Sequence, residues 1–81
     1  MLKVGLWGSL KPFTGGRDSV EVEAKTIGEL LRKLAAQYPG LEPAIERGVS
    51  VSVDGVIYNA TWSQPLDPKN EIFVLPRMGG G

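Results

Sequence analysis

The chain has 81 residues, 42% of them hydrophobic, which predicts a single domain with a modest core. It contains no cysteine and no histidine, so the sequence excludes disulfides, thiolate chemistry, and the side chain that most often binds metals or transfers protons. Nine basic and nine acidic residues balance, so no charge excess indicates a nucleic-acid or membrane partner.

The first part of the chain predicts a β-hairpin. Apolar residues alternate with polar residues or glycine over residues 2–6 and again over residues 20–24, which is the pattern of half-buried strands. The segment between them, residues 8–17, contains proline and several glycines, and we interpret it as a loop.

A helix is predicted next. Thr26 and Glu29 have the spacing of a capping box, in which a hydroxyl and a carboxylate satisfy N–H groups at the start of a helix. Five apolar residues then share one helical face: Ile27, Leu30, Leu31, Leu34 and Tyr38. Pro39 and Gly40 end the helix, and residues 41–47 predict a turn or a short helical piece.

The remaining elements are strands. Valines at alternate positions over residues 49–53 predict a strand, Asp54-Gly55 predicts a turn, and residues 56–58 predict a short strand after it. After a turn at residues 67–70, residues 72–75 form a short apolar run that Pro76 ends. This run is too apolar for an exposed edge, so we expect it in the centre of the sheet, beside the first strand.

These elements predict an α+β fold, in which a mixed sheet of four to five strands packs on one main helix. No apolar run approaches the roughly 20 residues that a membrane span needs, and no cleavage signal follows Met1, so we expect a cytoplasmic protein. The glycosylation pattern Asn59-Ala60-Thr61 is then a chance match.

The chain ends in three glycines directly after the last strand. Glycines bury no side chain and lose much backbone entropy on ordering, so such an ending does not stabilise the domain. We therefore divide the chain into a folded domain, residues 1–75, and a flexible tail, residues 76–81. The tail offers a thin peptide whose terminal carboxylate can enter the active site of another protein.

Taken together, the residues resemble the small sulfur carriers typified by the molybdopterin synthase small subunit (MoaD) and the thiamine-pathway carrier (ThiS). The order of elements is similar to that of the β-grasp, or ubiquitin-like, fold. The similar segments are Leu2-Lys3-Val4, Thr26-Ile27-Gly28-Glu29-Leu30-Leu31, Val51-Ser52-Val53-Asp54-Gly55, Gln64-Pro65-Leu66, and Glu71-Ile72-Phe73-Val74-Leu75-Pro76 with the terminal glycines.

The resemblance implies a protein co-substrate rather than an enzyme. A ubiquitin-activating-type adenylyltransferase, using ATP and Mg²⁺, would adenylate the carboxylate of Gly81, the residue after Gly80. A sulfur donor would then convert it to a thiocarboxylate, and a synthase large subunit is a further implied partner. The chain itself is expected to bind no cofactor. We expect the following residues to bind the partner: Phe73, Leu75, Pro76, Arg77, Met78 and Gly79.

Some alternatives stay open at this point. The product that receives the sulfur is expected to be molybdopterin-like first, with thiamine or another sulfur compound as options. The tail departs from the MoaD pattern, because Pro76-Arg77-Met78 stands where Pro-Pro is usual and one glycine is extra. Gly81 is therefore either trimmed or itself the acceptor. Two other functions compete: a modifier joined to lysines of other proteins, and an inert β-grasp binding module.

Overall fold

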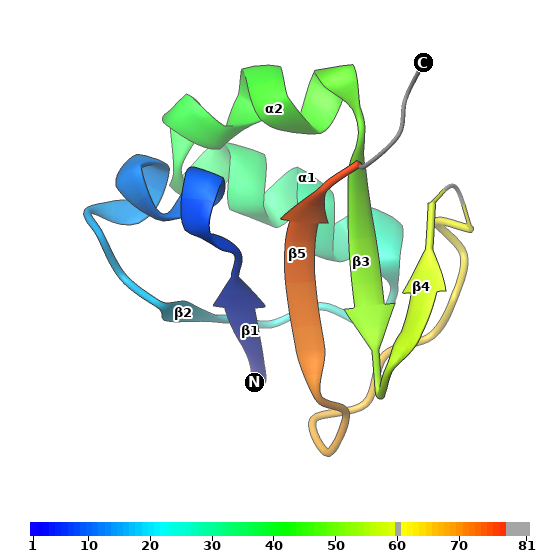
Figure 1. Ribbon diagram of the computed structural model, residues 1–81. Coiled ribbons are helices and arrows are strands. Elements are labelled where there is room, and N and C mark those ends of the chain that lie inside the picture. Colours follow the sequence, from blue (N-terminus) through cyan, green and yellow to red (C-terminus); the bar gives the residue numbers. More distant parts are fainter. Residues whose placement is uncertain (60, 78–81) are drawn as a thin grey trace.

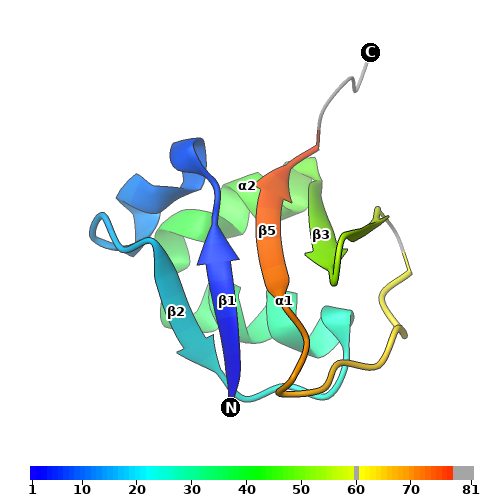
Figure 2. The same ribbon diagram turned by 60° about the horizontal axis from the view of Figure 1, so that its bottom comes forward.

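The computed structural model describes residues 1–59 and 61–77. Within them, five strands form one sheet in the order β2-β1-β5-β3-β4, and the helices cover one face of it (Figures 1 and 2). The strands are β1 (Leu2–Leu6), β2 (Ser19–Val22), β3 (Val49–Val53), β4 (Val56–Tyr58) and β5 (Ile72–Pro76).

The last strand lies at the centre of the sheet, which confirms the prediction. β5 runs parallel to β1 on one side and antiparallel to β3 on the other. β1–β2 and β3–β4 are antiparallel pairs, so the sheet is mixed. Pro76 still pairs with Val49, so the strand runs one residue past its predicted end. Its missing N–H is tolerated there because Pro76 is the last residue of β5.

The main helix, α1 (Ile27–Gln37), presents the predicted apolar face to the sheet. Ile27, Leu30 and Leu34 are fully buried, and they share the core with Val4 and Val51 of the neighbouring strands. The short helices η2 (Pro39–Leu41) and α2 (Glu42–Arg47) follow, so of the two structures predicted for residues 41–47, a turn or a short helical piece, the helical piece is present. None of the helices in the described residues has the length and apolar character that a bilayer crossing requires.

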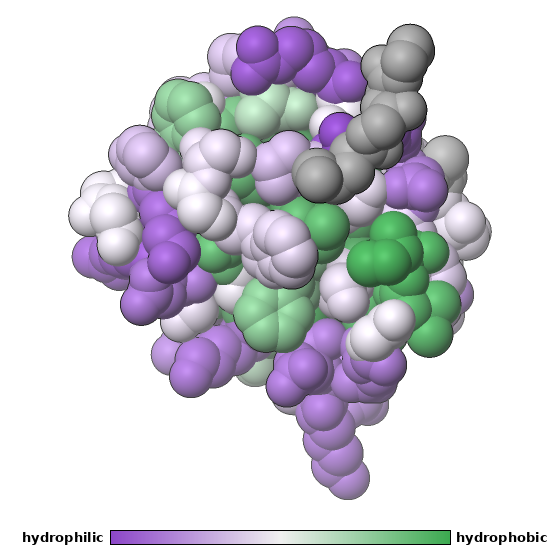
Figure 3. Space-filling view, viewed as in Figure 1, coloured by the Kyte–Doolittle hydropathy of each residue, from purple (hydrophilic) through white to green (hydrophobic). Residues whose placement is uncertain are grey.

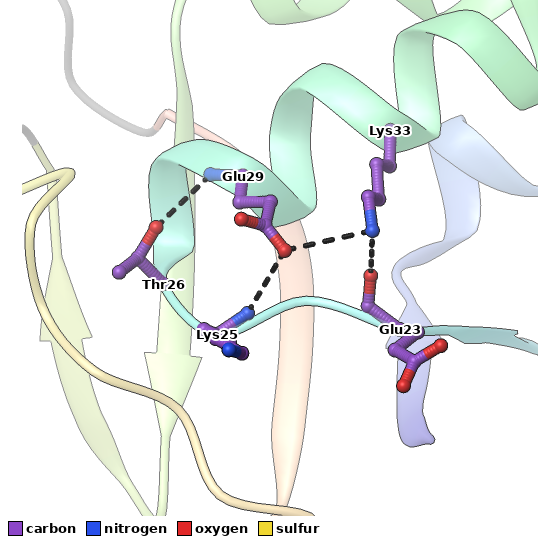
Figure 4. Close-up of polar contacts among 5 residues, drawn as sticks. All are labelled: Glu23, Lys25, Thr26, Glu29 and Lys33. Carbon is purple, nitrogen blue, oxygen red and sulfur yellow. Dashed lines mark hydrogen bonds and ion pairs between the residues drawn. The ribbon is translucent and has the colours of Figure 1, made fainter.

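The start of α1 is held by the predicted cap (Figure 4). The Thr26 hydroxyl accepts a hydrogen bond from the Glu29 N–H at 3.2 Å, and the Glu29 carboxylate accepts one from the Lys25 N–H at 3.3 Å. Lys33 lies 3.5 Å from the same carboxylate and donates to the Glu23 carbonyl at 2.6 Å. The cap therefore ties the helix to the chain that arrives from β2.

The segment after β4 completes this cap. The Ile27 N–H donates to the Gln64 carbonyl at 3.1 Å, and the Gly28 N–H donates to the Trp62 carbonyl at 2.8 Å. A Cβ on Gly28 would lie 3.2 Å from that carbonyl oxygen, so glycine permits the close approach. The free N–H groups of the first turn are thus satisfied within the domain rather than offered to a ligand.

One predicted loop is wrong. Between β1 and β2, residues of the expected loop form a 3-10 helix, η1 (Gly8–Thr14). Leu10 and Thr14 are buried, and the Thr14 hydroxyl donates to the Lys11 carbonyl at 3.0 Å. Burial of one apolar side chain orders this segment, although its composition is typical of a turn.

Candidate docking face and tail root

Among the described residues, no helix covers the second face of the sheet, and apolar side chains gather on it. We call this surface the open face and define it by Trp7, Ile57, Phe73 and Leu75. Ile72 and Val74 of β5 point into the core, so Phe73 and Leu75, which alternate with them, point outward. Figure 3 shows apolar surface over β5 and β4, with hydrophilic residues around it.

The members of the open face differ in exposure. Trp7 is 53% exposed and Ile57 is 51% exposed, whereas Phe73 is partly covered. Leu75 is only 8% exposed, so it adds little accessible surface in the free domain. Large, partly exposed aromatic side chains of this kind are common at the energetic centre of protein interfaces.

Beyond the open face, β5 leads directly to the C-terminal residues. Pro76 is half-buried at the end of the strand and Arg77 is exposed. The other predicted site residues, Met78, Gly79, Gly80 and Gly81, lie outside the described residues. The structure therefore brings Phe73, Leu75, Pro76 and Arg77 together on one strand and its continuation.

Arg77 is held by contacts that the sequence did not reveal. Its guanidinium donates a hydrogen bond to the Asn59 carbonyl, and the Ser50 hydroxyl donates to the Asn59 side-chain oxygen. Ser50 is buried in β3, so this network connects Arg77 to the centre of the sheet. A Cβ on Gly48 would lie 3.4 Å from the guanidinium carbon, so the same side chain also packs closely over Gly48. We call Ser50, Asn59 and Arg77 the bracket.

Sequence reasoning missed Ser50 and Asn59 as contributors to the site. Ser50 occupies a position where the strand pattern predicts only a polar, outward residue, and Asn59 stood out only as part of a chance glycosylation pattern. Arg77 lies 18 residues beyond Asn59, and no local pattern encodes a contact over that separation. The three residues come together because β3 pairs with β4 on one side and with β5 on the other.

The acidic side chains of the described residues are not arranged as a metal site. In residues 1–59 and 61–77, no three acidic side chains gather in a way that could hold a metal ion. Lys11 lies 2.9 Å from Asp18, and its hydrogen bond and positive charge hold the pKa of Asp18 below its usual value. This pair joins η1 to the residue before β2 at the surface.

Comparison with solved structures identifies the fold of the chain. CysO from Mycobacterium tuberculosis superposes with a TM-score of 0.78 at 23% identity, over 94% of this chain and 98% of CysO. The BexX/CysO complex from Amycolatopsis orientalis gives 0.77 at 20% identity, with both chains fully covered. The small archaeal modifier protein 1 from Methanosarcina acetivorans gives 0.77 at 22% identity, over 99% of this chain and 95% of that protein. These similarities confirm the predicted β-grasp fold.

The sequence comparison identifies the family. No curated protein matches the chain in sequence. The model of the ThiS family, however, matches residues 4–81, which is nearly the whole chain and includes the terminal glycines. The chain therefore belongs to the ThiS family of ubiquitin-like sulfur carriers, which are carrier proteins rather than enzymes and are activated by ubiquitin-activating-type enzymes.

Proposed function

We propose that this carrier is activated at the carboxylate of Gly81 and delivers sulfur as a terminal thiocarboxylate. The observation that carries the proposal is the continuity of β5, which displays Phe73 on the open face and runs straight on to Arg77. A partner that binds the open face is thereby positioned to receive the residues that follow, up to Gly81 and its neighbour Gly80. The family match extends through residue 81, which supports a role for the terminal residues.

The proposed chemistry takes place in two steps. A carboxylate oxygen of Gly81 attacks the α-phosphorus of ATP, which forms an acyl adenylate and releases pyrophosphate. Hydrosulfide (HS⁻) from a sulfur donor then attacks the acyl carbon, AMP leaves, and loss of a proton gives the terminal thiocarboxylate. Adenylation is required because an ionised carboxylate is a poor electrophile, and AMP supplies a good leaving group. Glycine suits this position because it lacks a Cβ that would crowd the acyl carbon.

ATP and Mg²⁺ are assigned to the partner. The sequence has no glycine-rich phosphate loop of the Gly-x-x-x-x-Gly-Lys type, and the N–H groups at the start of α1 are bonded within the domain. The activating adenylyltransferase therefore supplies the nucleotide, the metal ion and the orientation of the reactants. This carrier contributes the docking face, the tail and the carboxylate.

We also propose a setting for this chemistry. The protein acts in the cytoplasm, where the activating enzyme, the sulfur donor and a synthase large subunit would be its partners. A molybdopterin-like product is our first choice for the acceptor of the sulfur, followed by thiamine or another sulfur compound. Partner contacts are assigned to Phe73, Leu75, Pro76, Arg77, Met78 and Gly79.

The intact mass of the chain, purified from its own host, tests this proposal. Replacement of one terminal oxygen by sulfur supports a carrier, and the same measurement shows whether Gly81 has been trimmed. The matched control is a chain that lacks Gly80 and Gly81, which must not acquire sulfur.

Two other outcomes would overturn the proposal. Covalent adducts with other proteins that disappear when Gly80 and Gly81 are deleted, without any thiocarboxylate, would indicate a lysine modifier. An unchanged mass, together with no AMP adduct after incubation with ATP, Mg²⁺ and the activating enzyme of the host, would indicate an inert binding module.

A further inference from the structure

A groove lies beside the root of the tail, on the edge where β5 ends. Figure 1 shows that η1, α2 and the end of β5 meet at the same end of the molecule. The groove between them has a volume of about 510 Å³. It is separate from the open face. Its walls come from η1 and α2, with the start of β3 and the end of β5 between them, and none of the residues that define the open face lines it.

One part of the groove is apolar, and the side chains that form it are already packed in the free domain. Leu10 and Val49 line it and are almost completely buried, and Ala44 of α2 lies beside them. Phe13 forms one wall and is 44% exposed. A Cβ on Gly40 would lie 3.2 Å from the Phe13 ring, so the ring rests directly against the η2 backbone. An apolar side chain of a partner would therefore find a shaped site rather than one that must first be ordered.

The rim of the groove is positively charged. Arg47 and Arg77 both line the groove, and no carboxylate side chain within residues 1–59 and 61–77 does. This imbalance is local, because acidic and basic residues balance over the chain as a whole. The ion pairs within residues 1–59 and 61–77 join Lys11 to Asp18 and Lys33 to Glu29, so neither pair neutralises the rim.

The two guanidinium groups retain donors for a ligand. Arg77 uses one nitrogen for the Asn59 carbonyl, and a guanidinium has five N–H donors. Arg47 is exposed at the end of α2, where the N–H of Gly48 already satisfies the carbonyls of Ala44 and Ile45. Arginine pairs with carboxylates through two parallel hydrogen bonds, so the rim is suited to acidic side chains.

We propose that this groove is a second docking site, which receives a segment of the activating enzyme with one apolar side chain flanked by carboxylates. The inference rests on the proposed function, because an enzyme that takes up the tail must cover the surface around its root. The apolar side chain enters between Phe13 and Leu10, and the carboxylates pair with Arg47 and Arg77. The open face and the groove then flank the start of the tail and fix the direction in which it enters the enzyme.

Steady-state adenylation kinetics test this inference with a matched pair of variants. Arg47→Glu reverses a rim charge, whereas Arg32→Glu makes the same change on α1, at an exposed position that does not line the groove. We expect Arg47→Glu to raise the KM for the carrier about tenfold with kcat unchanged, and to weaken the salt dependence of KM. Arg32→Glu should leave KM within about twofold of the wild-type value. Equal KM values for the two variants would overturn the proposal.

A second experiment separates this inference from the proposed function. A short synthetic peptide, with one leucine between glutamates, is titrated into the isotope-labelled free carrier and followed by NMR. Shifts confined to the amides that line the groove, lost in Arg47→Glu and retained in Arg32→Glu, would support the docking site even if no enzyme adenylated the chain. Equal shifts with inorganic phosphate or ATP alone would overturn it in favour of a simple anion site. No shifts with the peptide would also overturn it.

Discussion

Gly5 and Phe73 face each other across the parallel pair of β1 and β5, and the Phe73 ring lies over the Gly5 backbone, where a side chain would otherwise stand. A Cβ on Gly5 would lie only 2.5 Å from the Cε1 atom of the ring. An aromatic side chain that covers a glycine on a neighbouring strand shields backbone that would otherwise be exposed. Gly5 therefore determines how Phe73 lies on the open face.

The first prediction is that Gly5→Ala displaces the Phe73 ring. The new methyl group overlaps the ring position, so the variant should lose about 1–3 kcal/mol of unfolding free energy, as overpacked sites do. Urea denaturation measures the loss, and the aromatic NMR signals of Phe73 report the displacement. Gly8→Ala is the control, because a Cβ there meets nothing within 4 Å. Unchanged Phe73 signals in Gly5→Ala would contradict the prediction.

The second prediction concerns the turn between β3 and β4. Asp54 has a φ of 51°, and its carboxylate accepts hydrogen bonds of 2.7 Å from the Glu71 N–H and from the Asn70 side chain. It thereby joins this turn to the turn that precedes β5. Asp54→Ala should cost about 1–3 kcal/mol of unfolding free energy, because it removes both hydrogen bonds and leaves alanine at a positive φ.

Asp54→Asn is the matched comparison for that change. Asparagine tolerates positive φ and keeps one side-chain oxygen as an acceptor, so we expect it to retain most of the stability. Chemical denaturation of both variants provides the measurement. Equal losses for the alanine and asparagine variants would show that the carboxylate contacts do not stabilise the turn as described.

The third prediction follows from the lowered pKa of Asp18. A carboxyl group whose pKa is lower in the folded state stabilises the fold above its unfolded pKa, and this stabilisation is lost as the pH falls through the folded value. Since its usual value is 3.8, the contribution of Asp18 should be present near neutral pH and disappear below that value. The pair with Lys11 is exposed, so the effect is small.

Denaturation of Asp18→Asn at about pH 6 and about pH 2.5 tests the sign of this effect. The variant should be slightly less stable than the wild type at the higher pH and equally stable at the lower one. A variant of Asp18 that lost stability only at the lower pH would refute the assignment.

The fourth prediction concerns the bracket. Ser50→Ala removes the donor that orients the Asn59 side chain and should thereby loosen the residue whose carbonyl holds Arg77. We expect the order parameter of the Arg77 Nε–H, measured by NMR relaxation, to fall in Ser50→Ala. Ser50→Thr keeps a hydroxyl and should retain the wild-type value. If Arg77 is equally ordered in all three proteins, Ser50 does not support it.

The strands and main helix could be predicted because each carries its own local pattern. Val49, Val51 and Val53 alternate with serines, and the apolar run of β5 places that strand in the sheet centre. η1 was predicted as a loop because residues 8–17 contain Pro12, Gly15 and Gly16, whereas its order depends on packing against η2, which comes much later in the sequence. Local signals do not report contacts of that kind.

The candidate site also contains residues that the sequence could predict and residues that it could not. Phe73 and Arg77 could be predicted because they shortly precede the terminal glycines. The bracket and the arginine-lined groove could not be predicted from the sequence, because they depend on residues from separate strands and helices that the fold brings together. In the sequence, Arg47 has only the features of a basic residue in the last turn of a helix, where such residues are common.

The central claim is that the reactive group of this protein is the carboxylate of Gly81, and the fifth prediction tests it. Adenylation by the activating enzyme, measured as ATP–pyrophosphate exchange, should be abolished when one alanine is added after Gly81, and it should persist when the alanine is added before Met1. Both extended chains should fold like the wild type by circular dichroism. Undiminished exchange by the C-terminally extended chain, with mass spectrometry showing the added alanine still in place, would contradict the claim.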